Sequence, residues 1–322
     1  MKKRVWSNIK LPLGDKSYLQ DVDVFIFSTG NGFLMIDAGL NTDESFSALI
    51  MGLKDLGYRL EGIKKLIITH YHLDHCGLAL RLQKMTSVPV YLHDSDKKIL
   101  EFFKKHLDGY PEKIWNFFHS YGVPDNTMDF ITKELYVYKA LLLGPTDTLP
   151  LQDGDRFEIE DGYIDVIATP GHTPGHVSLF YPEERILFGS DFILKDEWPH
   201  GGLYPHTKDY NPIKDYLESL KKVKAIEPKV IIPSHGEPIY EPLKRIDDAI
   251  GFMIRKIDEV YGTLKNGPLN LAQICDRVFR SYDSSLSYFF LLSLGLAYVK
   301  YLVEEGMAEE ISENGITLFK GV

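Results

Sequence analysis

Cysteine is scarce in this chain of 322 residues, which contains only Cys76 and Cys275. Two cysteines give no disulfide framework, so the composition favours a reducing, cytoplasmic compartment. Long apolar runs are also missing, and polar residues follow the basic start at residues 1–6 without an apolar segment. We therefore expect neither a secretory signal peptide nor a membrane span.

Positive charge is in deficit: 36 Lys and Arg residues face 46 Asp and Glu residues, a formal net charge of −10. This balance argues against a surface that binds nucleic acid generally, although a local basic groove stays open as an alternative. The hydrophobic content of 44% and the charged content of 25% are ordinary for a soluble globular protein. The length predicts a large core with an appendage.

The most informative motif is a cluster of ligand-type side chains after the apolar run 65–69. It contains His70, His72, Asp74 and His75 within six residues. Alternate side chains of an extended chain point the same way, so the first two could hold one metal while the last two face a second. Three imidazoles and a carboxylate suit zinc, with iron and manganese as alternatives. Unrelated core histidines would instead leave several buried rings in need of partners.

Three further ligand-type residues, His172, Asp191 and His235, also lie at the ends of apolar strands. Each stands where Gly or Pro lets the backbone turn. The stretches concerned are Ile164–His172, Leu187–Asp191 and Val230–Gly236. Four strand ends that all carry such residues indicate a shared metal centre.

This set of motifs resembles the metallo-β-lactamase superfamily of dinuclear hydrolases over roughly residues 15–240, including a first hairpin at 22–39. The resemblance implies an α+β fold, a four-layer αββα sandwich with the metals at one edge of two facing sheets. It also implies a ligand set: one metal on His70, His72 and His172, a second on Asp74, His75 and His235, and Asp191 as the bridge.

Four other positions refine the comparison with that superfamily. Asp37 corresponds to an aspartate that supports a ligand, with a turn aspartate as the alternative. Histidine rather than glutamate at position 72 argues against the diiron oxidoreductase branch. Aspartate rather than cysteine at position 191 argues against an antibiotic-degrading β-lactamase. Cys76 is interpreted as a packing residue, because the ligand set is complete without it.

The chain is expected to divide into a catalytic domain, 1–243, and a small, mostly helical, winged-helix-like domain, 244–322. A helical insertion at about 94–147 interrupts the first. Its aromatic residues are interpreted as a satellite core, with a hydrophobic lid over the substrate as a second role. Three apolar stripes predict its helices: Ile99, Phe103 and Leu107; Ile114, Phe118 and Tyr121; and Met128, Ile131, Leu135, Tyr138 and Leu142.

The last 80 residues predict three helices and a hairpin with an Asn-Gly turn at 310–319. This order resembles a winged helix. The apolar stretch 286–296 lacks the Arg, Lys, Asn or Gln side chains with which a recognition helix reads DNA. We expect it to pack on the catalytic domain or on a second subunit of a homodimer, and we expect no nucleic acid as partner.

Two divalent metals about 3.5–4 Å apart can share a water and lower its pKa, so the expected nucleophile is a metal-bridging hydroxide. Asp74 and Asp191 would orient that water, and Tyr204 in the loop 198–206 could polarise a carbonyl. The expected reaction is cleavage of a small-molecule ester, thioester or lactone. The alternatives are a phosphodiesterase or ribonuclease and a non-catalytic metal- or nucleic-acid-binding regulator, and the complete ligand set argues against the regulator.

Overall fold

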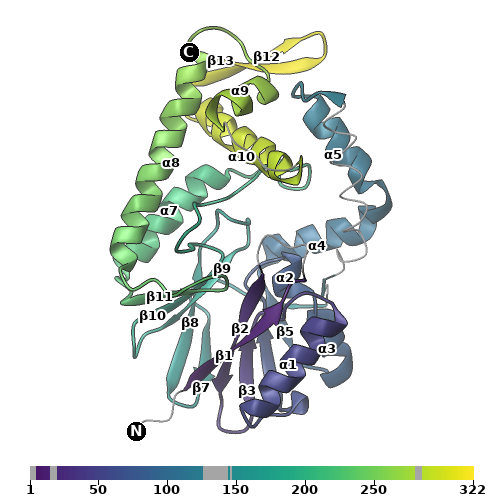
Figure 1. The fold of residues 1–322 in the computed structure, drawn as a ribbon, viewed down its shortest axis with the longest axis vertical. Coiled ribbons are helices and arrows are strands. Elements are labelled where there is room, and N and C mark those ends of the chain that lie inside the picture. Colours follow the sequence, from purple (N-terminus) through teal and green to yellow (C-terminus); the bar gives the residue numbers. More distant parts are fainter. Residues whose placement is uncertain (1–4, 15–19, 126–143, 146, 280–284) are drawn as a thin grey trace.

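Two facing β-sheets form the centre of the molecule in the computed structural model, which describes residues 5–14, 20–125, 144–145, 147–279 and 285–322 (Figure 1). The first sheet has the order β1-β2-β3-β4-β5-β6 and is antiparallel over its first three strands and parallel thereafter. Its strands are β1 (Trp6–Pro12), β2 (Asp21–Ser28), β3 (Phe33–Ile36), β4 (Ile63–Ile67), β5 (Val90–Leu92) and β6 (Leu149–Pro150).

The second sheet has the order β11-β10-β9-β8-β7, and only the β10–β11 pair is parallel. Its strands are β7 (Arg156–Ile159), β8 (Gly162–Ala168), β9 (Val177–Tyr181), β10 (Ile186–Ser190) and β11 (Val230–Pro233). The four strands that the sequence predicted to end in ligand-type residues are β4, β8, β10 and β11.

Strand β2 shows how the sheets acquire two apolar faces. Successive side chains of a strand point to opposite faces. Phe25 and Phe27 therefore enter the core between the sheets, whereas Val24 and Ile26 enter the core under the outer helices. Between the sheets, Phe188 of β10 packs edge-on against Phe25 and Phe27, with ring centroids 4.9 and 5.0 Å away. Burial on both faces explains why the strand is apolar throughout.

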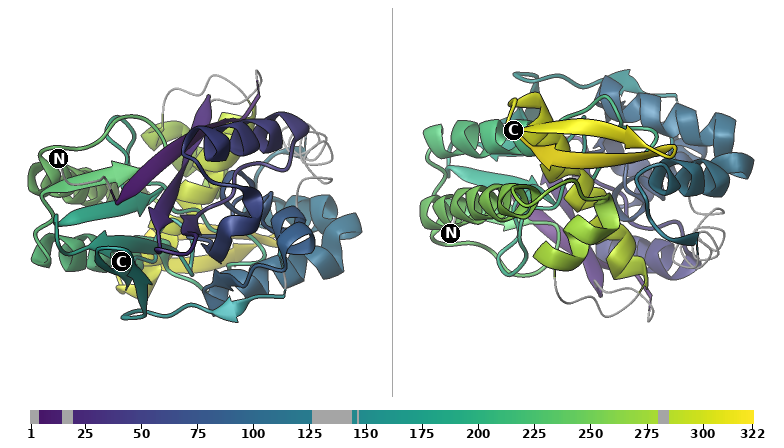
Figure 2. Two further views of the ribbon diagram at one scale, coloured as in Figure 1. Left: turned by 90° about the horizontal axis from the view of Figure 1, so that it is seen from below. Right: turned by 90° about the horizontal axis from the view of Figure 1, so that it is seen from above.

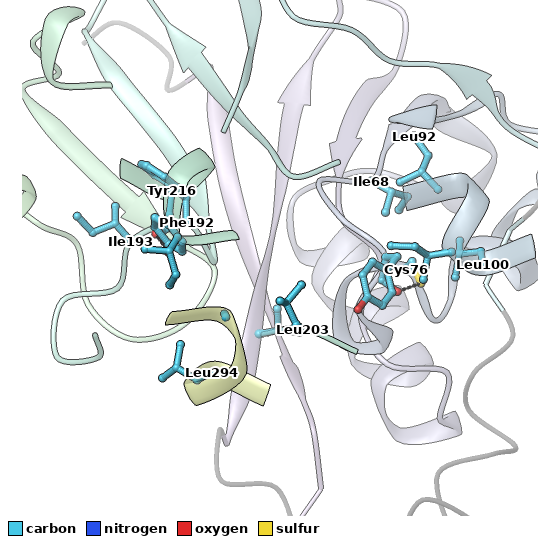
Figure 3. Packing of buried hydrophobic residues seen from close by; sticks show 14 of the residues in the cluster. Ile68, Cys76, Leu92, Leu100, Phe192, Ile193, Leu203, Tyr216 and Leu294 are labelled. Carbon is cyan, nitrogen blue, oxygen red and sulfur yellow. Dashed lines mark hydrogen bonds between the residues drawn. The ribbon is translucent and has the colours of Figure 1, made fainter. Parts of the chain in front are cut away.

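Helices cover both outer faces, so the expected four-layer αββα sandwich is confirmed. On the first sheet lie α1 (Asp43–Asp55) and α3 (Ala79–Thr86), with the short η1 (Leu60–Gly62) and α2 (Leu73–Cys76) between them. On the second sheet, Tyr216 of α7 (Pro212–Ala225) stacks on Phe192, as Figure 3 shows. Asn211 caps α7 by accepting from the Lys214 amide, and Pro212 occupies its first turn.

The insertion follows β5 and contains α4 (Asp94–His106), η2 (Leu107–Gly109) and α5 (Tyr110–His119). Its first two apolar stripes are buried at Ile99, Phe103, Ile114 and Phe118, but these side chains belong to the large core under the outer helices and not to a separate satellite core. The third stripe falls in 126–143, outside the described residues. Figures 1 and 2 both place α5 beside the C-terminal helices and hairpin.

Backbone hydrogen bonds join the insertion to the C-terminal region. The Leu271 amide donates to the Tyr121 carbonyl (3.0 Å), and the Thr317 amide donates to the Ser120 carbonyl (2.8 Å). The Tyr121 ring stacks on Phe319, with centroids 5.9 Å apart. The insertion is therefore anchored to the C-terminal region directly after α5.

The C-terminal region has the predicted order of three helices and a hairpin. Its elements are α8 (Pro242–Leu264), α9 (Leu271–Val278), α10 (Ser285–Glu304), β12 (Ala308–Glu313) and β13 (Ile316–Gly321). Asn314 and Gly315 form the turn with φ of 51° and 79°, the left-handed pair that an Asn-Gly hairpin uses. The domain boundary at 243/244 stays a prediction, and α8 begins at Pro242. No helix within the described ranges is long and apolar enough to cross a membrane.

Helix α10 is apolar around most of its circumference because it is enclosed by other elements. Phe289, Leu292 and Leu296 are buried, and the helix packs against α7, α8, α9 and β12. The Leu203 amide donates to the Ser293 carbonyl (3.0 Å), so α10 also contacts the loop that follows Asp191. This arrangement confirms that the apolar stretch packs on the rest of the chain.

Candidate metal centre

The seven residues that the sequence marked as ligands meet at the carboxyl ends of four strands. His70 and His72 follow β4, and Asp74 and His75 lie in the one-turn helix α2. The other three follow β8, β10 and β11. They form two groups, and within each group the ligand-type atoms all lie within 4.8 Å of one another. The first group contains His70, His72, His172 and Asp191, and the second contains Asp74, His75 and His235.

The Asp191 carboxylate lies between the two groups and turns one oxygen to each. Its Oδ2 lies 3.7 Å from His172 Nε2 and 4.0 Å from His70 Nε2. Its Oδ1 lies 3.4 Å from His75 Nε2 and 3.5 Å from His235 Nε2. A carboxylate in this position can bridge two cations.

Several buried atoms of the centre have no hydrogen-bond partner, although buried polar atoms are nearly always paired. Within the described residues these include His70 Nε2, His75 Nε2, His235 Nε2 and Asp191 Oδ1. In addition, His72 Nδ1 and His172 Nε2 are 3.0 Å apart. Nitrogen and oxygen atoms that converge without partners fit the ligand preferences of zinc and related cations.

Three rings of the centre are held through their Nδ1 atoms, which leaves Nε2 available as a ligand for a cation. The acceptors lie 2.7 to 2.8 Å away: Asp37 Oδ2 for His75, the His200 carbonyl for His172 and the Asp21 carbonyl for His235. An acceptor at Nδ1 fixes the proton there and leaves the Nε2 lone pair available.

Asp37 is buried and has a φ of 60°, in the left-handed region that aspartate tolerates better than most residues. Its carboxylate accepts from the Thr69 amide (2.8 Å) and the Thr69 hydroxyl (2.9 Å) besides His75. The same hydroxyl lies 3.1 Å from His70 Nδ1. These contacts fit the supporting role that the resemblance implied better than that of a turn aspartate.

The charges of the centre suit cation binding. Burial would raise the pKa of the Asp74 carboxyl, but His75 and His235 bring it down to about 2. Burial, followed by the nearby imidazole of His172, lowers the pKa of His72 to about 3. Asp191 and Asp74 raise the pKa of His75 against the effect of burial. The first group therefore offers neutral rings, and the second offers a charged carboxylate.

Residues 18–235 match the family model of the metallo-beta-lactamase superfamily. The chain belongs to this superfamily. Membership, together with the two ligand clusters, identifies it as an enzyme of the metallo-hydrolase class.

Relatives of this metallo-β-lactamase superfamily chain match it over most of its length. "Probable metallo-hydrolase YqjP" of Bacillus subtilis is 24% identical and covers 93% of each chain. The "Atrochrysone carboxyl ACP thioesterase" of Aspergillus fumigatus is 24% identical over 78% of this chain and 46% of its own. A metallo-beta-lactamase family protein of Thermus thermophilus shares the fold over 99% of both chains, with a TM-score of 0.82 and 24% identity.

Tyr204 lies outside both ligand groups of this metallo-hydrolase. Its hydroxyl is 3.0 Å from Ser293 Oγ of α10, and its ring stacks on His206 with centroids 5.4 Å apart. Burial raises the pKa of Tyr204 to about 12, so the hydroxyl keeps its proton at neutral pH. The loop around it borders the centre, because the His200 carbonyl accepts from His172.

Two further histidines near the centre, His176 and His206, have structural surroundings. His176 is buried, with Nδ1 2.9 Å from the Thr169 hydroxyl. His206 lies between two tyrosines, with Nε2 3.3 Å from Tyr71 OH and Nδ1 3.1 Å from Tyr110 OH. Cys76 packs among apolar side chains, including Leu100, with Sγ 3.0 Å from the Tyr71 carbonyl, which supports its interpretation as a packing residue (Figure 3).

Sequence reasoning missed Asp96, a fully buried carboxylate in the first turn of α4 that contacts two ligand loops. One signal could have found it. The apolar strand at 88–92 also ends in polar residues, His93 to Asp96, and so resembles the four strand ends that carry ligands.

Proposed function

We propose that the chain is a hydrolase that holds two divalent cations, preferably zinc, and cleaves a carboxylic ester, thioester or lactone. The observation that carries the proposal is the position of the Asp191 carboxylate, with one oxygen toward each group of ligand-type atoms. When bound, the cation pair supplies Lewis acidity and lowers the pKa of a shared water. Iron and manganese are the alternative metals.

Each residue of the centre has a distinct task in this proposal. His70, His72 and His172 hold one cation, and Asp74, His75 and His235 hold the other. The Asp74 and Asp191 carboxylates, both charged at neutral pH, accept hydrogen bonds from the attacking water and orient it. Tyr204, a protonated hydroxyl, donates to the substrate carbonyl as charge develops on its oxygen.

The surroundings of the centre support an acyl substrate. The insertion and the loop after Asp191 contribute aromatic rings such as Phe102, Tyr204 and His206, with Phe102 6.0 Å from His206. The net charge of −10 does not favour a polyanion. The thioesterase among the relatives is named for an acyl carrier substrate, which supports a thioester as one form of the substrate.

A reducing compartment is part of the same proposal, with the cytosol as its simplest form. Cys76 and Cys275 are both free and buried, and burial raises the pKa of both thiols. Protonated, inaccessible thiols are packing residues.

A substrate panel and one tyrosine variant test the reaction class. With metal-replete protein we expect hydrolysis of generic thioesters or lactones to exceed that of bis-aryl phosphodiesters and short RNA. Tyr204→Phe should lower kcat on the acyl substrate by up to about a hundredfold, with both cations retained, because one donor to the oxyanion is lost. Tyr240→Phe, at a residue that is 75% exposed, serves as the matched control.

RNA cleavage well above any acyl activity, falling steeply with added salt, would replace the acyl proposal by a ribonuclease. Unchanged acyl hydrolysis in Tyr204→Phe would remove Tyr204 from the mechanism and leave the cation pair in place.

The Asp37→Asn variant tests whether the Asp37 carboxylate holds His75 in position to bind the cation of the second group. The amide retains the backbone preference of position 37 but no longer carries the charge that accepts from His75 Nδ1. We expect the affinity for one of two cations to fall by about 10- to 100-fold. Competition with a chelator of known affinity measures it, with Asp55→Asn on the exposed end of α1 as control. Wild-type affinity for both cations in Asp37→Asn would contradict the prediction.

A further inference from the structure

Asp96 is a buried carboxylate that belongs to neither ligand group, yet it contacts both loops that carry the first group. Its Oδ2 accepts from the Tyr71 amide (2.9 Å) and from the Thr173 hydroxyl (2.8 Å). Its Oδ1 accepts from the Gly175 amide (2.7 Å). These donors lie 25, 77 and 79 residues away in the sequence, so one side chain joins α4 to two distant loops.

We propose that Asp96 is a positioning residue that sets the spacing of the first cation group by tying the loop of His70 and His72 to the loop of His172. Tyr71 stands between the first two histidines, and Thr173 directly follows the third. The inference rests on the proposed function, because it concerns the geometry of one of its two cations.

The contacts favour a carboxylate over an amide: burial raises the pKa of Asp96 to about 7, and the three hydrogen-bond donors act against that rise. All three partners donate, and a carboxylate offers acceptors only. An asparagine at this position would turn an NH₂ group toward at least one of the donors and leave it unpaired in a buried place. The position in the first turn of α4 also favours a negative charge.

Gly175 shows how closely the second loop approaches the carboxylate. A Cβ atom at this position would lie 2.7 Å from Asp96 Oδ1, so a larger residue would displace one of the two. The loop thus comes within hydrogen-bonding distance only because position 175 is glycine.

The second cation group is anchored independently of Asp96. His75 is held by Asp37, and His235 is held by the Asp21 carbonyl. Neither anchor contacts the Asp96 side chain among the described hydrogen bonds. Loss of the Asp96 carboxylate should therefore weaken one cation and spare the other.

Chelator competition on the full-length protein, titrated with zinc, tests this selectivity. We expect Asp96→Asn to weaken one of two zinc equivalents by about 10- to 100-fold and to leave the other at the wild-type affinity. Asp94→Asn, two residues earlier and exposed, should retain both. In Asp96→Asn combined with Asp37→Asn, both equivalents should be weak, because Asp96 contacts the loops of the first group and Asp37 directly holds His75 of the second.

Three results would overturn the proposal: wild-type affinity for both equivalents in Asp96→Asn, equal weakening of both, or one tight equivalent left in the double variant. If Asp96→Asn fails to fold, Thr173→Val decides instead, because it removes one donor and keeps the shape and the carboxylate. A smaller, selective weakening of one equivalent supports the proposal, and no change refutes it. Wild-type protein that binds fewer than two equivalents would contradict the proposed function itself, separately from Asp96.

Discussion

Asp191→Ala is expected to abolish hydrolysis and to weaken both cations at once. Its two oxygens face different ligand groups, so one substitution removes a ligand from each. Loss of a residue that only supports a ligand costs about 10- to 100-fold in affinity, and the loss of a shared ligand should exceed that at both positions. The metal content after dialysis, measured by elemental analysis, should be near two equivalents per chain in the wild-type protein and well below one in Asp191→Ala.

Asp196→Ala is the matched control, since this exposed carboxylate lies in the same loop. It should retain two equivalents and full activity. An Asp191→Ala protein that keeps one cation at wild-type affinity would show that the carboxylate does not bridge the groups. Restored binding at high zinc without restored turnover would still agree with a bridging role, because the water would lack its carboxylate acceptor.

Leu296→Asp is expected to prevent stable folding of the whole chain. Leu296 is fully buried in α10, and the helix contacts α7, α8, α9 and β12. The substitution removes a packed side chain and buries a carboxylate without a partner, so we expect a loss of more than about 4 kcal/mol of stability. A typical domain has only about 5–15 kcal/mol. Solubility and thermal melting measure the effect.

Phe290→Asp controls for the charge, because Phe290 lies on the same helix and is 42% exposed. It should melt within a few degrees of the wild type. A Leu296→Asp protein that stays soluble, keeps two cations and melts normally would contradict the structural role of α10.

The ligand residues could be predicted from the sequence because each one is marked locally. His172, Asp191 and His235 each follow an apolar strand and stand beside Gly or Pro, and the fold then brings the strand ends together. The four layers follow from the resemblance to the superfamily and not from a local pattern. Strand β1 alternates weakly, with exposed Asn8 and Lys10 on either side of buried Ile9, and it was not predicted from the sequence.

Asp96 carries only one local signal, the polar end of the apolar strand before it, and its sequence is otherwise typical of an exposed helix start. Its proposed function comes from partners on two other loops, and the local sequence does not encode such contacts. The same holds for Tyr204: its residue type and loop suggested a catalytic role, but its contact with Ser293 depends on how α10 packs. Contacts through backbone amides, such as Leu271 with Tyr121, leave even less trace in a sequence.

Those backbone contacts close the polypeptide into a loop around the metal centre: from β5 through α4 and α5, across to α9 and β13, and back along α8 to the second sheet. Each of the two inserted or appended segments completes the hydrogen bonding of the other. Replacing one segment alone would remove the backbone amides that donate to the carbonyls of Ser120 and Tyr121. Substrate range in chains built this way should therefore diversify by changing both segments together, as a single inherited unit.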